Sequence, residues 1–254
     1  MSEKQKPETK HTIYHVLILD SSGSMECVRS QTISGFNENL KTIRDSEQDG
    51  VEQRVCLVTF STGVPDRKIW NKSIKSAEEL SIATYIPGGG TALLDAIGTT
   101  VQSLKDEIKD QIEARTANVI VTVFTDGEEN SSCEFTGKQI SELKEELEKS
   151  RMWTFTLIGC SEATLKAAMN MGFQAGNVMR YAATQQGTSR AFSDLSRSRA
   201  AYTKGVVSAS ACFAASGNDK QYEATLGALQ ADFFAADPTD NQQDEKDKKN
   251  KKGK

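Results

Sequence analysis

Runs of aliphatic and β-branched residues, each followed by a segment with helical spacing, are the feature that most limits the fold of this chain. The runs are continuous rather than alternating, as expected for strands that are covered on both faces. They occupy residues 11–19, 54–61, 117–125, 152–159 and, more weakly, 177–182. Helical spacing is found at residues 32–48, 92–114, 136–150, 161–171 and 189–204. This order predicts an α/β fold with a mainly parallel central sheet, flanked by helices and joined by right-handed crossovers.

Local signals agree with this order. Thr136 and Gln139 have the spacing of a capping box, in which each side chain satisfies an N–H group of the first helical turn. Ser161 with Thr164 offers a weaker helix start. Residues 65–80 predict a short edge strand and a connection, because their charged side chains would discourage pairing with another sheet.

Length, charge and hydropathy exclude several classes of protein. The 254 residues have ordinary apolar content, which is enough for one sizeable core. The formal net charge of -4 is spread over mixed signs without a sustained basic stripe, so nucleic acid is not the expected partner. No apolar stretch approaches the length of about 18 residues that spans a bilayer, and the first residues are polar. We therefore expect a soluble protein with no membrane segment and no cleaved export signal.

The cysteines indicate a reducing compartment, and we expect the protein to be cytoplasmic. They stand far apart, contain no CxxC pair, and several lie in apolar runs where cysteine behaves as a small hydrophobe, which favours structural thiols over the alternative of a disulfide or zinc framework. The five are Cys27, Cys56, Cys133, Cys160 and Cys212.

Composition divides the chain into four parts. We expect a polar N-terminal extension over residues 1–10, the main domain over 11–204, an Ala- and Ser-rich extension over 205–239, and a charged disordered tail over 240–254. The tail has too few hydrophobic residues to offset the entropy of ordering it, and nuclear localisation or polyanion binding is its alternative role. Within the extension, residues 220–236 predict an amphipathic helix whose apolar residues are Leu226, Leu229, Phe233 and Phe234.

Polar residues at the ends of two strands indicate a metal site. The turn Asp-Ser-Ser-Gly-Ser at residues 20–24 directly follows an apolar run, and its carboxylate and alternate hydroxyls can face one divalent cation, although a plain polar turn is the alternative. Asp126 ends a second buried strand, and Thr91 follows a glycine run that allows close backbone approach. Open α/β sheets bind ligands beyond the carboxyl ends of their strands, which is where Asp20 and Asp126 lie.

These segments resemble the von Willebrand factor type A (VWA) domain with its metal ion-dependent adhesion site (MIDAS). The family's Asp-x-Ser-x-Ser segment corresponds to Asp20, Ser22 and Ser24, its threonine to Thr91, and its distal aspartate to Asp126. The resemblance covers residues 11–204 and implies a doubly wound, Rossmann-like fold. It also implies that the three hydroxyls bind the metal directly, whereas the two aspartates often act through water.

The sequences of residues 124–132 and 152–159 resemble those of compact stand-alone members of the family from bacteria and phages. The chain departs from these small members at Cys160 and Ser161, where they often have Ala-Asn. This departure leaves the five proposed metal residues unchanged.

Hydroxyl and carboxylate oxygens are hard donors, which suit Mg²⁺ or Mn²⁺. A cation held largely by neutral hydroxyls keeps much of its charge and seeks an anionic ligand. The resemblance implies that an Asp or Glu of a protein partner supplies it. The predicted function is therefore non-enzymatic, metal-dependent protein binding, as in an intracellular adaptor.

Neighbouring polar residues have two interpretations each. Glu128, Glu129 and Asn130 could shape the choice of partner or form a solvated loop, and direct coordination is a further alternative. Asp95 could brace the site through a hydrogen bond or lie on the surface at a helix start. His11 and His15 have a spacing that pairs ligands on a helix, but their segment is predicted as strand, which favours a structural role.

Two other functions are alternatives. A metal-dependent hydrolase could use a serine of the first motif, but the sequence has neither a Gly-x-Ser-x-Gly elbow nor a P-loop, and both histidines precede that motif. A scaffold with a non-functional metal site could instead bind partners through the helix predicted at residues 220–236, although packing on the domain's own core is the simpler role for that helix.

Overall fold

The computed structural model describes residues 10–48 and 50–234 and contains one six-stranded sheet in the order β3-β2-β1-β4-β5-β6. Only the edge strand β3 is antiparallel to its neighbour, so the prediction of a mainly parallel sheet is confirmed. The predicted tail and all but the last residue of the predicted N-terminal extension lie outside the described residues. The strands are β1 (His11–Asp20), β2 (Val51–Phe60), β3 (Asp66–Ser73), β4 (Ala117–Thr125), β5 (Trp153–Gly159) and β6 (Val178–Arg180).

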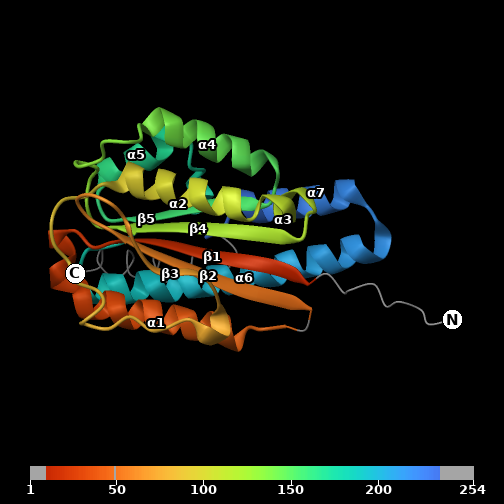
Figure 1. The fold of residues 1–254 in the computed structure, drawn as a ribbon, viewed down its shortest axis with the longest axis horizontal. Coiled ribbons are helices and arrows are strands. Elements are labelled where there is room, and N and C mark those ends of the chain that lie inside the picture. The colour runs from red at the N-terminus through yellow and green to blue at the C-terminus, as the bar shows by residue number, and fades with distance from the viewer. Residues whose placement is uncertain (1–9, 49, 235–254) are drawn as a thin grey trace, which may run out of the picture.

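Helices cover both faces of the sheet, and Figure 1 shows α1 and α6 on one face and α2, α4 and α5 on the other. The α-helices are α1 (Arg29–Asp45), α2 (Leu93–Glu107), α3 (Lys109–Glu113), α4 (Gly137–Lys149), α5 (Glu162–Asn170), α6 (Gln185–Ser216) and α7 (Asp219–Ala231). Short 3-10 helices occupy Gly23–Val28, Ile74–Ser76 and Ala175–Asn177. Among the described residues, none of the helices combines the length and the apolar character needed to cross a bilayer.

The register of the central strands sets where the functional residues lie. β1 lies between β2 and β4, with Leu19 opposite Phe124 and Asp20 opposite Phe60. All nine residues of β4 are buried, as expected for a strand covered on both faces. The residues that follow β1 and β4 therefore meet at one edge of the sheet.

Predicted helix starts are confirmed in the loops around this edge. The Thr136 hydroxyl accepts a hydrogen bond from Gln139 N at 3.3 Å, and the Gln139 side chain accepts one from Thr136 N at 2.8 Å, completing the capping box. The Ser161 hydroxyl likewise accepts from Thr164 N at 2.9 Å. The edge strand predicted within residues 65–80 is β3, and its first residues are charged and exposed.

Two predicted helices differ from those observed. The helix expected over residues 92–114 is broken at Ile108, whose side chain is buried at the bend between α2 and α3. The helix expected to end at residue 204 continues to Ser216, because the following Ala-rich segment is a strong helix former. It ends at Gly217, which has a left-handed φ of 63°. The helix thus crosses the boundary placed between residues 204 and 205, and the division of the chain there stays a prediction.

The C-terminal helix packs on the domain. α7 is shorter than the expected 220–236 and contacts both α6 and β5. Leu226 and Phe233 are fully buried, and the Phe233 ring lies 5.7 Å from that of Tyr202. A Cβ at Gly205 would lie 2.6 Å from Leu229, so this glycine lets α6 and α7 approach closely. Leu226 and Phe233 therefore serve the domain's own core, which is the simpler of the two roles expected for this helix.

Candidate metal centre

Asp20 ends β1 with both carboxylate oxygens hydrogen-bonded. Oδ1 accepts from Ser22 N at 2.6 Å, and Oδ2 accepts from the Thr125 hydroxyl at 2.5 Å. The residue is fully buried. Because Thr125 is the last residue of β4, this contact joins the ends of the two central strands and fixes the carboxylate at the edge of the sheet.

The two serines of the first motif face the distal aspartate. Ser22 Oγ and Ser24 Oγ are 3.1 Å apart, and the Ser24 hydroxyl donates to Asp126 Oδ1 at 2.7 Å. The three oxygen atoms therefore form a chain that runs from the β1 loop to the β4 loop.

Thr91 lies near the Asp20 carboxylate, and both side chains face Gly127. Its backbone N–H donates to Asn130 Oδ1 at 2.8 Å, and Asn130 N donates to the Thr91 carbonyl oxygen at 3.1 Å. A Cβ placed on Gly127 would lie 2.7 Å from Thr91 Oγ1 and 3.4 Å from Asp20 Oδ2, so both oxygens face this glycine. The structure thus brings together all five residues that the sequence singled out.

The glycine run before Thr91 docks on the first motif. Gly88 N donates to the Ser21 carbonyl oxygen at 2.8 Å, and Gly23 N donates to that of Gly89 at 3.1 Å. Gly89 has a φ of 78°, a conformation that favours glycine. Gly90 N donates to the Thr62 hydroxyl at 2.6 Å, a contact with the loop after β2 that sequence reasoning missed.

Two neighbouring carboxylates support the loops. Asp95 accepts hydrogen bonds from the N–H groups of Cys133, Glu134 and Phe135 at 2.7, 2.9 and 2.8 Å, so it braces the loop after β4. Glu129 accepts from Leu94 N at 2.9 Å and from the N–H groups of residues 131 and 132. Both oxygens of Glu129 are occupied in this way, which argues against the alternative that it coordinates the metal directly.

A buried tyrosine whose role was not predicted from the sequence supports the candidate metal centre through a hydrogen bond. The Tyr85 hydroxyl donates to the main-chain carbonyl oxygen of Asp20 at 2.5 Å, and the side chain is fully buried. Arg29 in turn donates to the Tyr85 carbonyl oxygen at 2.9 Å. No sequence motif predicts this role of Tyr85, because its neighbours Ile82 and Ile86 are apolar as well and nothing in the sequence sets it apart from them.

Burial raises the pKa of both aspartates. The pKa of Asp20 rises to about 6 because its carboxylate is desolvated, and the charge of Asp126 adds to the rise while hydrogen bonds from Thr125 and Ser22 oppose it. Desolvation also raises the pKa of Asp126, against the hydrogen bond from Ser24. Two adjacent acids surrounded by hydroxyl groups are an arrangement that a divalent cation would stabilise.

The donor set fits a hard cation. Hydroxyl and carboxylate oxygens are the ligands that Mg²⁺ and Mn²⁺ prefer. Within the described ranges, no group of three or more His, Cys, Asp or Glu side chains is placed to hold a metal ion. Both histidines are bonded elsewhere: His15 Nε2 lies 2.9 Å from Gln53 Oε1, and His11 Nε2 lies 2.8 Å from Asn118 Oδ1.

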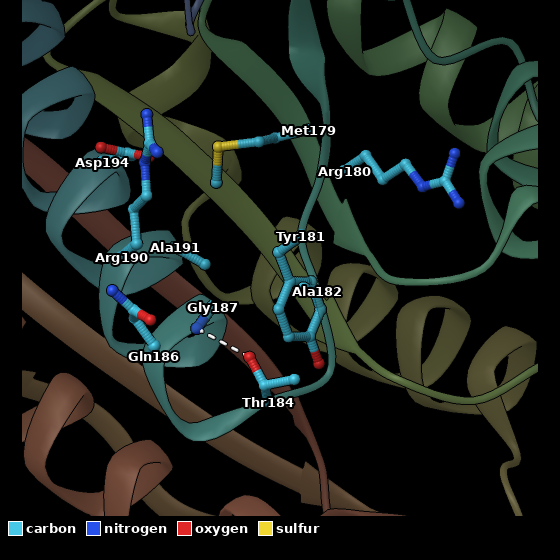
Figure 2. A pocket seen from close by; sticks show the side chains of 10 residues that line it. All are labelled: Met179, Arg180, Tyr181, Ala182, Thr184, Gln186, Gly187, Arg190, Ala191 and Asp194. Atoms are coloured by element: carbon cyan, nitrogen blue, oxygen red, sulfur yellow. Dashed lines mark hydrogen bonds and ion pairs between the residues drawn. The ribbon is translucent and has the colours of Figure 1, made fainter. Parts of the chain in front are cut away.

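A cavity of about 500 Å³ lies beside β6 and the start of α6. Figure 2 shows Met179, Tyr181 and Arg190 among its lining residues, together with the hydrogen bond of 3.1 Å from Gly187 N to the Thr184 hydroxyl. None of the five residues of the candidate metal centre lines it. The centre and this cavity are therefore separate features.

Comparison with known proteins identifies the fold. A family model described as the von Willebrand factor type A domain matches residues 16–195. A structure of proximal thread matrix protein 1 from the mussel byssus, with a zinc-occupied MIDAS motif, is 14% identical with a TM-score of 0.52 and covers 76% of this chain and 46% of that one. The vWF domain of the type V pili tip protein Mfa5 from Porphyromonas gingivalis is 9% identical with a TM-score of 0.50 and covers 74% and 95%.

These structural likenesses concern the fold alone. The chain spans about half the length of the mussel structures that it matches. No curated protein sequence matches it. The resemblance to compact bacterial and phage members stays a prediction.

Proposed function

The chain belongs to the von Willebrand factor type A domain family, and we propose that it is a protein-binding module that depends on a divalent cation. The observation that carries this proposal is the hydrogen-bonded group formed where three loops meet, joined by the 2.7 Å contact between Ser24 Oγ and Asp126 Oδ1. The residues proposed to hold the cation are Asp20, Ser22, Ser24, Thr91 and Asp126.

The cation would be Mg²⁺ or Mn²⁺, and it would supply a positively charged centre that attracts a carboxylate. Ser22, Ser24 and Thr91 would contribute neutral hydroxyls, and the two aspartates would act through water, so the ion would keep much of its positive charge at its open position. An Asp or Glu of a partner protein would complete its ligands. The zinc-occupied MIDAS motif of the mussel structure, which has a similar fold, supports a divalent ion at this position.

We propose no enzymatic activity for this centre. A serine nucleophile would need a base, and the two histidines of the chain are bonded to Gln53 and Asn118 within the sheet. An adaptor role in the cytoplasm belongs to the same proposal. The free thiols of all five cysteines are compatible with a reducing compartment.

Metal binding is tested first with Thr91→Val, which removes one hydroxyl while keeping the size of the side chain. Its two backbone hydrogen bonds to Asn130 are retained, so the variant is expected to fold. The electron paramagnetic resonance signal of free Mn²⁺ measures binding, which should weaken by about tenfold or more. Thr42→Val is the matched control, because the Thr42 hydroxyl bonds within α1.

Partner binding is tested by affinity capture from extract of the natural source cells in Mg²⁺ or in EDTA. A partner should be retained by the wild type in Mg²⁺ and lost both in EDTA and with Thr91→Val. Unchanged Mn²⁺ binding by Thr91→Val, or a partner that stays bound in EDTA, would contradict the proposal.

A further inference from the structure

Exposed aliphatic side chains gather on the loops beside the candidate metal centre. Among the described residues, the large hydrophobic side chains that remain exposed are Val64 (89%), Ile82 (71%), Ile86 (68%) and Met169 (48%). Val64 lies in the connection after β2, and Ile82 and Ile86 lie in the connection that leads from β3 back to the glycine run beside the metal residues. We call Val64, Ile82 and Ile86 the aliphatic rim.

Both rim loops are joined to the metal residues by hydrogen bonds. Val64 lies two positions after Thr62, whose hydroxyl accepts from Gly90 N, next to Thr91. Ile86 directly follows Tyr85, whose hydroxyl donates to the Asp20 carbonyl oxygen. The rim is therefore continuous with the proposed cation site through short, direct connections.

The segment that carries Ile82 and Ile86 is held in one conformation. Arg29 donates to the carbonyl oxygens of Ile82 and Tyr85. At the start of the segment, Leu80 N donates to Asn37 Oδ1 at 2.8 Å, and Asn37 Nδ2 donates to the Leu80 carbonyl oxygen at 2.9 Å. Since the backbone is already ordered, a ligand on this surface would lose little conformational entropy from it.

The opposite side of the centre is polar. There the exposed Glu128 lies beside the start of α5, where its carboxylate accepts a hydrogen bond from the Ser161 hydroxyl at 3.4 Å. Glu128 thus gives this side of the centre an acidic group, whereas the exposed aliphatic side chains lie on the loops between β2 and α2. A ligand whose carboxylate reached the cation would meet the aliphatic rim on one side only.

We propose that the aliphatic rim binds branched aliphatic side chains of the partner, next to the acidic residue that completes the metal site. The partner is then a protein segment in which an Asp or Glu has Leu, Ile or Val on one side. This inference rests on the proposed function, because the carboxylate places the segment. Exposed apolar groups beside a polar site are typical of interaction surfaces, and burying them against aliphatic side chains adds to affinity.

A peptide display library with a fixed central Asp tests this specificity on the full chain, with selection in Mg²⁺ and elution by EDTA. The wild type should enrich Leu, Ile or Val on one side of the Asp, and replacing them by Ser in a selected peptide should weaken binding on the order of tenfold. Ile82→Ser combined with Ile86→Ser should lose the enrichment while Mg²⁺-dependent selection of Asp remains. Met169→Ser, on α5, is the matched control and should keep the enrichment.

A different experimental result would contradict each part of the proposal. Selection of Asp peptides without aliphatic enrichment, or enrichment unchanged in the double variant and in Val64→Ser, overturns the rim alone. Equal selection from a matched library with central Asn overturns the proposed function, and the rim with it. A dimer of the wild type in sedimentation that the double variant loses would assign the rim to a second copy of the chain and overturn the proposed partner.

Discussion

The Tyr85 hydroxyl donates a hydrogen bond to the main-chain carbonyl oxygen of Asp20 at 2.5 Å, although the two residues are 65 positions apart. This contact links the end of β1 to the segment that bears Ile82 and Ile86. A single buried side chain therefore supports both the candidate metal centre and the aliphatic rim.

Tyr85→Phe should lower the free energy of unfolding by about 1 kcal/mol, because the carbonyl group of Asp20 loses its buried donor. The variant should also weaken Mn²⁺ binding, since the first motif is less firmly held. Urea denaturation and Mn²⁺ titration measure the two effects. Tyr14→Phe, which removes a hydrogen bond to Gln111 elsewhere, should leave Mn²⁺ affinity unchanged. Wild-type Mn²⁺ affinity in Tyr85→Phe would refute a supporting role for the hydroxyl.

Gly127→Ala should impair metal binding by about tenfold or more, because the added Cβ would lie 2.7 Å from Thr91 Oγ1 and must displace it. Calorimetric titration with Mn²⁺ measures the loss. Gly137→Ala is the matched control, since its Cβ would meet nothing closer than Met171 Cγ at 4.0 Å. Equal affinity of the two alanine variants would show that Thr91 Oγ1 does not need its observed position.

Asp95→Asn should destabilise the loop after β4 by about 2 kcal/mol, because three N–H groups lose a charged acceptor. Amide hydrogen exchange at residues 133–135 should accelerate, which mass spectrometry can follow. Asp106→Asn, at an exposed position of α2, should leave this exchange unchanged. Unaltered protection in Asp95→Asn would mean that the loop is held by other contacts.

His15 should make the folded protein less stable as the pH drops below about 6.5, whereas the raised pKa of Asp20 acts in the opposite direction between about 6 and its ordinary value. Burial and the charge of Arg199 lower the pKa of His15 to about 3, against the hydrogen bond to Gln53. Between these values the unfolded chain binds a proton that the folded chain does not, so this group costs about 1 kcal/mol of stability per pH unit of acidification. Urea denaturation between pH 6.5 and 4.5 measures this slope. The wild type should lose stability relative to His15→Gln over this range, and parallel curves for the two proteins would contradict the assignment.

The order of the elements could be predicted from the sequence because buried parallel strands leave continuous apolar runs. The capping residues of α4 and α5 were predictable as well, since the contacts lie within three positions. Helix ends were less predictable: the bend at Ile108 and the extension of α6 to Ser216 depend on what packs against these segments.

The five proposed metal residues were predicted from strand ends and from the family resemblance, and the structure brings their side chains together. Among their supports, Asp95 was named from the sequence as a residue that could brace the site, and its hydrogen bonds to the loop after β4 bear this out. The other supports were not predicted. Tyr85, Thr62 and Asn130 are joined to the centre by hydrogen bonds across 65, 28 and 39 positions. The spacing of hydrophobic residues along the sequence does not predict such contacts, because they depend on loop conformations that follow from the complete fold.

The chemistry of the centre follows from its residue types alone, since hydroxyl and carboxylate side chains are hard oxygen donors wherever they lie. Which residues surround them depends on how distant segments pack. The register of β1 against β4 places Asp20 beside Thr125, and the docking of the glycine run places Thr91 at Gly127. The same packing leaves Ile82 and Ile86 exposed on an anchored loop, because hydrogen bonds to Arg29 and Asn37 hold the backbone there and keep both side chains out of the core.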